Sequence, residues 1–120
     1  MKQLTKAEEE VMQYLWKLEK AFVKEILEQM PEPKPAYNTV STIVRILEQK
    51  GFLGFEAFGK SHRYYPLITK EDYSKSNLNL MVQNYFGGSF KQLVSFFVKE
   101  ENLSLKEIEE LKSIIDQNKQ

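Results

Sequence analysis

The stretch that determines the fold reads YNTVSTIVRILEQKG and covers residues 37–51. Its apolar side chains recur three or four residues apart, which places them on one side of a helix. Polar residues other than carboxylates occupy the opposite side, and such side chains hydrogen-bond to phosphates and base edges in the major groove of DNA. The pattern predicts a DNA recognition helix that Gly51 ends. The apolar residues are Val40, Ile43, Val44 and Leu47, and the polar residues are Asn38, Ser41, Thr42, Arg45 and Gln49.

Two amphipathic helices are expected before this stretch. Thr5 and Glu8 have the spacing of a capping box, which predicts the start of a helix over residues 6–20. A second apolar stripe begins at Val23 and must end at Pro31, because proline lacks the N–H that a helix interior requires. Two further prolines make the connection to the recognition helix stiff and extended.

After the recognition helix the periodicity changes to that of strands. Residues 52–67 alternate between two faces, with the turn sequence Gly-Lys-Ser at residues 59–61 in their middle, and this predicts a β-hairpin with a basic tip. Three helices followed by a hairpin are typical of a winged helix-turn-helix domain. We expect a mainly α protein of the α+β winged-helix type, with a two-stranded wing and a DNA-binding domain over residues 1–69.

The side chains expected to contact DNA lie on the polar side of the recognition helix and at the hairpin tip. Backbone N–H groups at the start of the helix can hold a phosphate, and Arg45 is suited to guanine. The tip would lie beside a phosphate strand or the minor groove. A solvated helix face and an ordinary soluble turn are the alternatives. The predicted DNA-binding residues are Asn38, Thr39, Ser41, Thr42, Arg45, Lys60, Ser61, His62, Arg63 and Tyr64.

Residues 70–120 predict three further helices, with caps at Thr69 and Ser104 and a break at Gly87-Gly88. Three such helices form a weak core by themselves, so we expect a dimerisation domain in which a second copy shares the core. A homodimer also suits a DNA inverted repeat. A core formed within one monomer is the alternative. The predicted dimerisation residues are Leu78, Met81, Tyr85, Phe90, Leu93, Val94, Phe97, Ile108, Leu111 and Ile115.

Composition excludes several classes of protein. The 120 residues are 42% apolar and 28% charged, which is typical of a globular chain with one domain or two very small ones. No signal peptide and no apolar run long enough to cross a membrane is found, so we expect a cytoplasmic protein without membrane insertion. With no cysteine and the single His62, disulfides, metal sites and cofactors are not expected.

Charge is distributed unevenly although the formal net charge is zero. Residues 34–66 contain five bases and two acids, a net charge of +3, whereas residues 100–120 contain three bases and six acids, a net charge of −3. A neutral chain with a basic middle favours selective DNA binding over indiscriminate coating of nucleic acid.

Residues 54–61, GFEAFGKS, match the phosphate-loop pattern of nucleotide-binding enzymes. That loop must open a helix whose N–H groups surround the phosphates, yet here the residues on both sides alternate like strands. Glu56 would also place a negative charge beside the phosphates. We therefore reject a nucleotide-hydrolysing enzyme and expect no enzymatic activity.

Three segments together resemble the BlaI/MecI-type penicillinase repressors over nearly the whole chain. They are LTKAEEEVMQYLW at residues 4–16, NTVSTIVRILEQKGFL at 38–53 and GGSFKQLVSFFVKEENLSLKEIEELKSII at 87–115. The resemblance implies a dimeric winged-helix transcriptional repressor that binds inverted-repeat operators of β-lactam-resistance or related genes. A regulator that answers another signal, and a winged-helix module that binds protein, are the alternatives.

The resemblance also implies a mode of induction. In the family, a membrane-bound sensor metallopeptidase signals induction and the repressor is cut within its dimerisation helix, at a bond that corresponds to Phe96–Phe97. The family has asparagine before that bond, whereas this chain has Phe96. Copper-responsive relatives carry a C-terminal cysteine cluster, so copper sensing by that route is excluded here.

Overall fold

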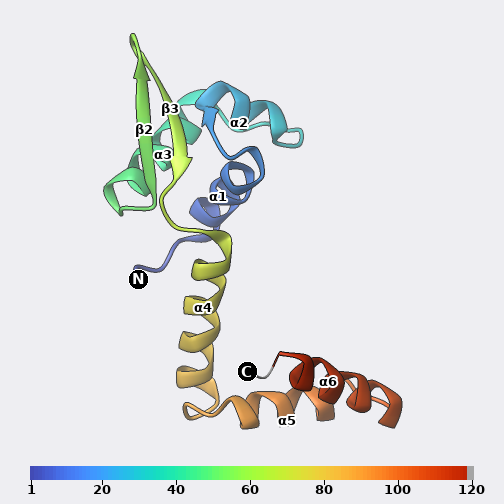
Figure 1. Cartoon of the computed structure of the whole chain (residues 1–120). Helices are drawn as coiled ribbons and strands as arrows, with labels where there is room; N and C mark the ends of the chain where they lie inside the picture. The colour runs from blue at the N-terminus through green and yellow to red at the C-terminus, as the bar shows by residue number, and fades with distance from the viewer. Residues whose placement is uncertain (119–120) are drawn as a thin grey trace. The chain divides into compact units, whose positions relative to one another are not determined.

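A computed structural model describes residues 1–118, which form two compact units, one from Met1 to Asn77 and the other from Leu78 onward (Figure 1). All six expected helices and both strands of the hairpin are present in the described residues. The elements are α1 (Lys6–Leu18), β1 (Ala21–Phe22), α2 (Val23–Gln29), α3 (Tyr37–Gln49), β2 (Leu53–Phe58), β3 (Ser61–Pro66), α4 (Lys70–Tyr85), α5 (Phe90–Glu100) and α6 (Leu105–Gln117).

The core of the first unit lies between α1, α2, α3 and the adjoining part of the sheet. The predicted capping box starts α1: the Thr5 hydroxyl accepts from the Glu8 N–H at 3.2 Å, and the Glu8 carboxylate accepts from the Thr5 N–H at 3.0 Å. Each helix then buries its apolar stripe, which contributes most of the stability of a small domain. The most deeply buried side chains of this unit include Val11, Met12, Leu15, Ile26, Val40, Val44, Leu47, Phe52 and Leu53.

The end of α3 joins the recognition helix to the sheet. Gly51 has a φ of +83°, its N–H donates to the Glu48 carbonyl at 3.0 Å, and the Phe52 N–H donates to the Leu47 carbonyl at 2.9 Å. This is a Schellman motif, in which a left-handed glycine satisfies the last carbonyls of a helix. Leu47 and Phe52 are both fully buried. Gly51 therefore ends α3 as predicted.

The sheet has three strands in the order β1-β3-β2. β2 and β3 form the predicted hairpin, in which Phe55 lies opposite Tyr64. On the other edge of β3, β1 pairs Ala21 with Tyr64. The sequence did not predict β1, because a strand of two residues shows no alternation. α1 accordingly ends at Leu18 instead of residue 20, and Glu19 turns the chain toward β1 with a φ of 69°.

The structure confirms that residues 54–61 are not a phosphate loop. β2 passes through a turn directly into β3, so a strand and not a helix follows the Gly-Lys-Ser sequence. Gly54 lies under the ring of Tyr65, where an added Cβ would come within 2.7 Å of the ring. The glycine of the motif thus makes room for a neighbouring side chain and not for a phosphate.

The first turns of α4 pack onto the first unit. The ring of Tyr73 lies 5.9 Å from that of Trp16 and 5.6 Å from that of Phe52, and its hydroxyl accepts from the Leu4 N–H at 3.3 Å. The boundary between the compact units therefore falls inside α4, after Asn77, and not at the sequence break after residue 69. The DNA-binding and dimerisation roles of the two parts remain predictions.

The second unit buries few of its side chains. The expected break is present at Gly87 and Gly88, which both have positive φ angles. The expected cap is also present, as a capping box between Ser104 and Glu107. Among its described residues, however, Val82 alone is buried. The apolar residues of α5 and α6 are all at least partly exposed.

A buried ion pair links the start of α1 to the end of α3. The Lys50 ammonium lies 2.6 Å from the Glu8 carboxylate, which is 7% exposed. Burial raises the pKa of Glu8, but the hydrogen bonds from Lys50 and Thr5, together with the Lys50 charge, outweigh this effect. The pKa of Glu8 therefore lies below its ordinary value of 4.5.

We expect Lys50→Met to lower the free energy of unfolding by about 1–3 kcal/mol at neutral pH, because it leaves a buried carboxylate without its partner. Urea denaturation measures the change. The matched control is Lys20→Met, which breaks the 3.0 Å Lys20–Glu56 pair, whose side chains are 50% and 45% exposed. Exposed pairs contribute about 0–1 kcal/mol.

The difference between wild type and Lys50→Met should depend on pH. A lowered folded-state pKa stabilises the protein above the unfolded-state value and ceases to do so as the pH falls through the folded value. The Lys50→Met defect should therefore shrink as the solution is acidified below 4.5, the ordinary pKa of Glu8. A defect of constant size would contradict this role for the ion pair.

Candidate DNA-binding surface

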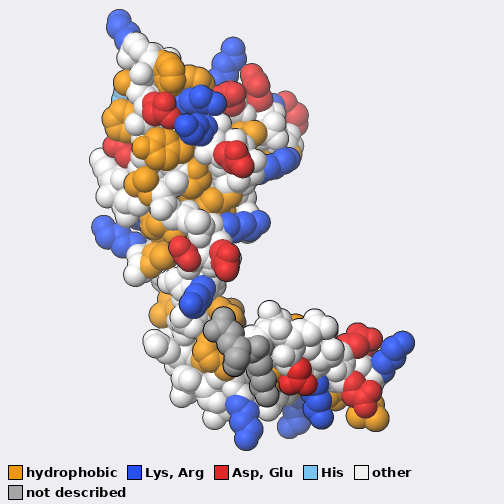
Figure 2. Space-filling model, in the orientation of Figure 1, with side chains coloured by type: hydrophobic (Ala, Val, Ile, Leu, Met, Phe, Trp, Pro, Cys, Tyr) orange, Lys and Arg blue, Asp and Glu red, His pale blue; other side chains and the backbone are white. Residues whose placement is uncertain are grey.

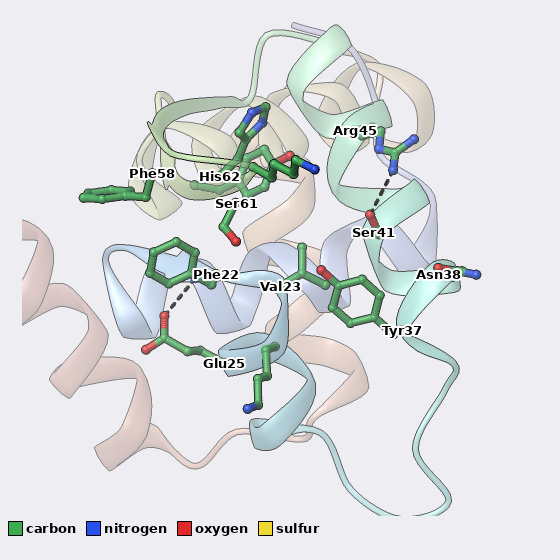
Figure 3. A pocket seen from close by; sticks show the side chains of 13 residues that line it. Phe22, Val23, Glu25, Tyr37, Asn38, Ser41, Arg45, Phe58, Ser61 and His62 are labelled. Carbon is green, nitrogen blue, oxygen red and sulfur yellow. Dashed lines mark hydrogen bonds between the residues drawn. The ribbon is translucent and has the colours of Figure 1, made fainter.

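A groove of about 790 Å³ lies between the N-terminal ends of α2 and α3 and the wing formed by β2 and β3 (Figure 3). Segments far apart in the sequence thus contribute to one surface. The lining residues are Phe22, Val23, Lys24, Glu25, Tyr37, Asn38, Ser41, Arg45, Phe58, Lys60, Ser61, His62 and Tyr64.

The recognition helix presents its polar side because its apolar side is fixed in the core. Val40 and Val44 are fully buried, so Arg45 points away from the core and is exposed. Its guanidinium donates to the Ser41 hydroxyl at 3.4 Å, as the dashed line in Figure 3 shows. This bond is at the long end of the normal range. The guanidinium is therefore free to exchange its Ser41 contact for a stronger acceptor.

The wing brings aromatic and basic side chains to the other side of the groove. His62 stacks on Phe55 with ring centroids 4.2 Å apart and an angle of 13° between the planes. Phe58, which is 50% exposed, meets Phe22 edge to face at 5.7 Å. Figure 2 shows hydrophobic side chains at the surface over this part of the first unit, next to cationic and acidic groups. Lys60 lies in the turn between the strands.

The structure brings most of the predicted DNA-binding residues together. Three of them do not line the groove. Thr39 is exposed outside it, and the Thr42 hydroxyl donates to the Asn38 carbonyl at 2.8 Å. Arg63 lies opposite Glu56, on the face of the sheet opposite to that of His62 and Tyr64, and its Nε is buried without a hydrogen-bond partner in the described part of the chain. The seven that line the groove are Asn38, Ser41, Arg45, Lys60, Ser61, His62 and Tyr64.

Sequence reasoning missed the contribution of β1, α2 and two aromatic residues. Lys24 and Glu25 lie at the start of α2, where the Glu25 carboxylate accepts from the Phe22 N–H at 2.8 Å. Tyr37 begins α3, and Phe58 ends β2. The prediction of a helix-turn-helix could have indicated Lys24, because the start of the second helix faces the start of the third. The groove position of Phe22 could not be found, since it depends on the unpredicted strand β1.

The groove is positively charged. Three cations line it, Lys24, Arg45 and Lys60, against the single carboxylate of Glu25. That carboxylate is hydrogen-bonded to the Phe22 N–H. Two of the bases counted in residues 34–66 interact outside the groove. The Lys50 ammonium pairs with Glu8, and the Lys34 ammonium caps the end of α2. The positive charge that reaches the groove is therefore concentrated in three side chains.

Tyr64 lines the groove but is buried, with 6% exposure, the same as that of Val23. Burial raises the pKa of its hydroxyl above the ordinary value of 10.0, with smaller contributions from Glu48 and Tyr37 that exceed the opposite effect of the Arg45 charge. The hydroxyl therefore remains protonated over the whole physiological range. Tyr64 can serve there as a neutral hydrogen-bond donor.

The predicted dimerisation residues divide into two groups in the second unit. Leu93, Ile108 and Leu111 are half-buried. The others are exposed, and two of them, Met81 and Tyr85, line an apolar groove of about 610 Å³ with Phe86, Gln92 and Phe96. The exposed residues of the predicted set are Leu78, Met81, Tyr85, Phe90, Val94, Phe97 and Ile115. Nothing within the described second unit covers this apolar surface.

A search of the described residues finds no helix long and apolar enough to cross a membrane. Within residues 1–118, no cluster of three or more His, Asp or Glu side chains could hold a metal ion.

The fold and the groove together define a winged-helix protein of the DNA-binding type. The family model described as penicillinase repressor matches residues 4–117, so the chain belongs to the penicillinase repressor family, as the sequence resemblance predicted. Members of this family are transcriptional repressors and not enzymes.

Similar proteins support this assignment. The chain is 31% identical over 115 residues to the methicillin resistance regulatory protein MecI of Staphylococcus aureus (strain N315), covering 95% of this chain and 94% of MecI. It is 27% identical over 118 residues to the penicillinase repressor of Bacillus licheniformis, covering 98% and 92% respectively. The solution structure of the DNA-binding domain of the repressor BlaI aligns with a TM-score of 0.52 and 29% identity, over 59% of this chain and 88% of that domain.

The raised pKa of Tyr64 can be tested by alkaline titration. We expect the difference in tyrosinate absorbance between wild type and Tyr64→Phe to develop above pH 10.0, the ordinary pKa of a tyrosine hydroxyl. The stabilising effect of the protonated hydroxyl should be lost as the pH rises through the folded-state pKa. Ionisation of Tyr64 at or below that ordinary value would show that the hydroxyl is solvated.

Proposed function

We propose that two copies of this chain bind an inverted-repeat operator in double-stranded DNA and repress the genes beside it. The observation that carries this proposal is the groove, which unites the polar side of α3, the start of α2 and the tip of the wing in one cationic surface. A recognition helix with a flanking basic hairpin matches the way winged-helix proteins bind the major groove and the adjacent backbone.

The side chains of the groove have different roles in this proposal. Arg45 lies on the exposed side of α3, where a guanidinium can donate two hydrogen bonds to one guanine. Lys24 and Lys60 flank the helix from α2 and from the wing, where they contact phosphates. Phosphate contacts supply affinity and its dependence on salt, whereas base contacts supply selectivity.

The apolar surface of the second unit supports the dimer. Tyr85 is 79% exposed, Phe96 is 53% exposed and Phe97 is 47% exposed, although aromatic side chains are usually buried. Contiguous exposed apolar surface on a small unit marks an interaction site. In a two-fold symmetric dimer, the apolar surface of each protomer would cover that of the other. The two-fold axis would also present two equivalent DNA-binding grooves to the two halves of an inverted repeat.

Induction by proteolysis would act on this dimer. In the proposal, a membrane-bound sensor metallopeptidase, encoded next to the regulated genes, triggers cleavage at the Phe96–Phe97 bond. The regulated genes are β-lactam-resistance or related genes. The bond lies inside α5, so this helix must open before a peptidase can bind it in an extended form. Separation of the protomers would then halve the contacts to DNA.

Selection from a random duplex pool, followed by gel shifts, tests the proposed function. We expect the wild-type chain to enrich an inverted repeat and to bind it more tightly than random duplex, with an affinity that falls as salt rises. Absence of sequence-selective binding would instead favour a module that binds protein.

Two variants separate base reading from phosphate contact. Arg45→Ala should cost about 1–3 kcal/mol on the selected duplex and relax the base preference at one position in each half-site. Lys60→Ala should weaken binding to selected and random duplexes alike and make the salt dependence less steep. Equal losses on both duplexes for both variants would contradict this division of roles.

A charged substitution tests the dimer surface. Phe97→Asp should convert the dimer into a monomer in light scattering, because the dimer would have to bury an unpaired carboxylate. Phe58→Asp is the matched control, since Phe58 is 50% exposed against 47% for Phe97 but lies in the wing. A Phe97→Asp chain that stays dimeric would place the interface elsewhere.

A further inference from the structure

The turn between α2 and α3 is closed by one side chain, that of Lys34. Its ammonium lies 3.0 Å from the Leu27 carbonyl oxygen, 3.2 Å from that of Glu28 and 2.7 Å from that of Met30. An ammonium has three N–H donors, so each one has a carbonyl acceptor. Lys34 is thereby attached to the end of α2.

The composition of the turn explains why a side chain, and not the backbone, donates hydrogen bonds to the last carbonyls of α2. The last carbonyls of a helix lack partners within the helix and are usually satisfied by backbone N–H groups that follow it. Here Pro31, Pro33 and Pro35 have no N–H, and the Lys34 N–H donates to the Glu32 carboxylate at 3.4 Å. The Leu27 carbonyl also accepts from the Met30 N–H at 3.1 Å, so the ammonium supplies the missing donors for the Glu28 and Met30 carbonyls and a second donor for that of Leu27. Its charge is favourable at the negative end of the helix dipole.

This attachment ties the segment that leads into α3 to the end of α2. Lys34 precedes the first residue of α3, Tyr37, by three positions and is held to the last residues of α2. The opposite end of α2 carries Lys24 into the groove, and α3 carries Arg45 into it. A looser turn would change the separation between these two cations without removing either of them.

We propose that Lys34 is a positioning residue for DNA binding, which holds α2 and α3 in the arrangement that matches a specific duplex without contacting DNA itself. The inference rests on the proposed function. From the sequence, Lys34 counts among the bases of the chain's positive middle, but it is not among the predicted DNA-binding residues. The structure assigns its ammonium to three carbonyls of the same chain.

The two roles predict different behaviour in a salt titration. Loss of a phosphate contact makes the dependence of log K on log salt less steep by about 0.9 for each contact, and it affects specific and random DNA alike. Loss of a positioning contact leaves that slope unchanged and weakens mainly the specific complex, whose geometry is more demanding.

The test uses the full-length chain with a duplex that the wild type selects from a random pool, and with a scrambled duplex of the same length. Fluorescence anisotropy at several salt concentrations is measured for wild type, Lys34→Met and the phosphate-contact control Lys60→Met. Lys34→Met should weaken binding to the selected duplex by about tenfold, the scale of residues that act on a site without touching it. Binding to the scrambled duplex and the salt slope should stay unchanged.

A less steep slope for Lys34→Met, equal to that of Lys60→Met, would overturn the proposal in favour of a phosphate contact. Unchanged affinity for both duplexes would overturn it as well. If the wild type selects no duplex, the proposed function fails, and that result is distinct from either of these.

A second variant covers the case in which Lys34→Met does not fold, which thermal melting reveals. Lys34→Arg keeps the charge, but its planar guanidinium cannot direct three donors to three converging carbonyls. It should lower the preference for the selected duplex by a smaller factor, again at unchanged slope. Full wild-type preference in Lys34→Arg would show that charge alone matters and would overturn the proposal.

Discussion

Burial of one side of α3 is the constraint on which the rest of the structure depends. Val40, Val44 and Leu47 are completely inaccessible, so the helix cannot rotate without exposing them and its polar side must face outward. The same burial fixes the Schellman turn at Gly51, because Phe52 enters the core directly after it. The wing begins one residue later. Its position beside the recognition helix thus follows from packing at the end of α3.

Charge in this protein is organised by local pairing more than by composition. The basic residues of the chain's middle serve different purposes: Lys50 neutralises a buried carboxylate, Lys34 closes a turn, and Arg45 and Lys60 line the groove. A net charge counted along the sequence cannot distinguish these uses. The groove is a small cationic site on a neutral molecule, which suits selective binding better than general attraction to nucleic acid.

The elements with strong local signals were predictable from the sequence. Capping boxes, prolines and Gly51 determined where helices start and end, and alternation identified the wing. The strand β1 was not predictable, since two residues show no alternation. Without β1 in the prediction, the position of Phe22 in the groove could not be foreseen. Alternation along the predicted strand places Arg63 and His62 on opposite faces of the sheet, but the sequence could not show that His62 lines the groove and Arg63 does not. The boundary inside α4 depends on Tyr73, whose burial comes from contacts distant in sequence.

The single tryptophan lies at the junction where α4 leaves the first unit. The indole N–H of Trp16 donates to the Ile68 carbonyl at 2.9 Å, and its ring lies 5.9 Å from that of Tyr73. Indole emission responds to hydrogen bonding and to nearby aromatic groups, so the protein contains its own fluorophore at this junction. The emission spectrum of Trp16 would report, without any added label, whether the first turns of α4 stay packed on α1. Neither α5 nor α6 contains a tryptophan that would add to this emission.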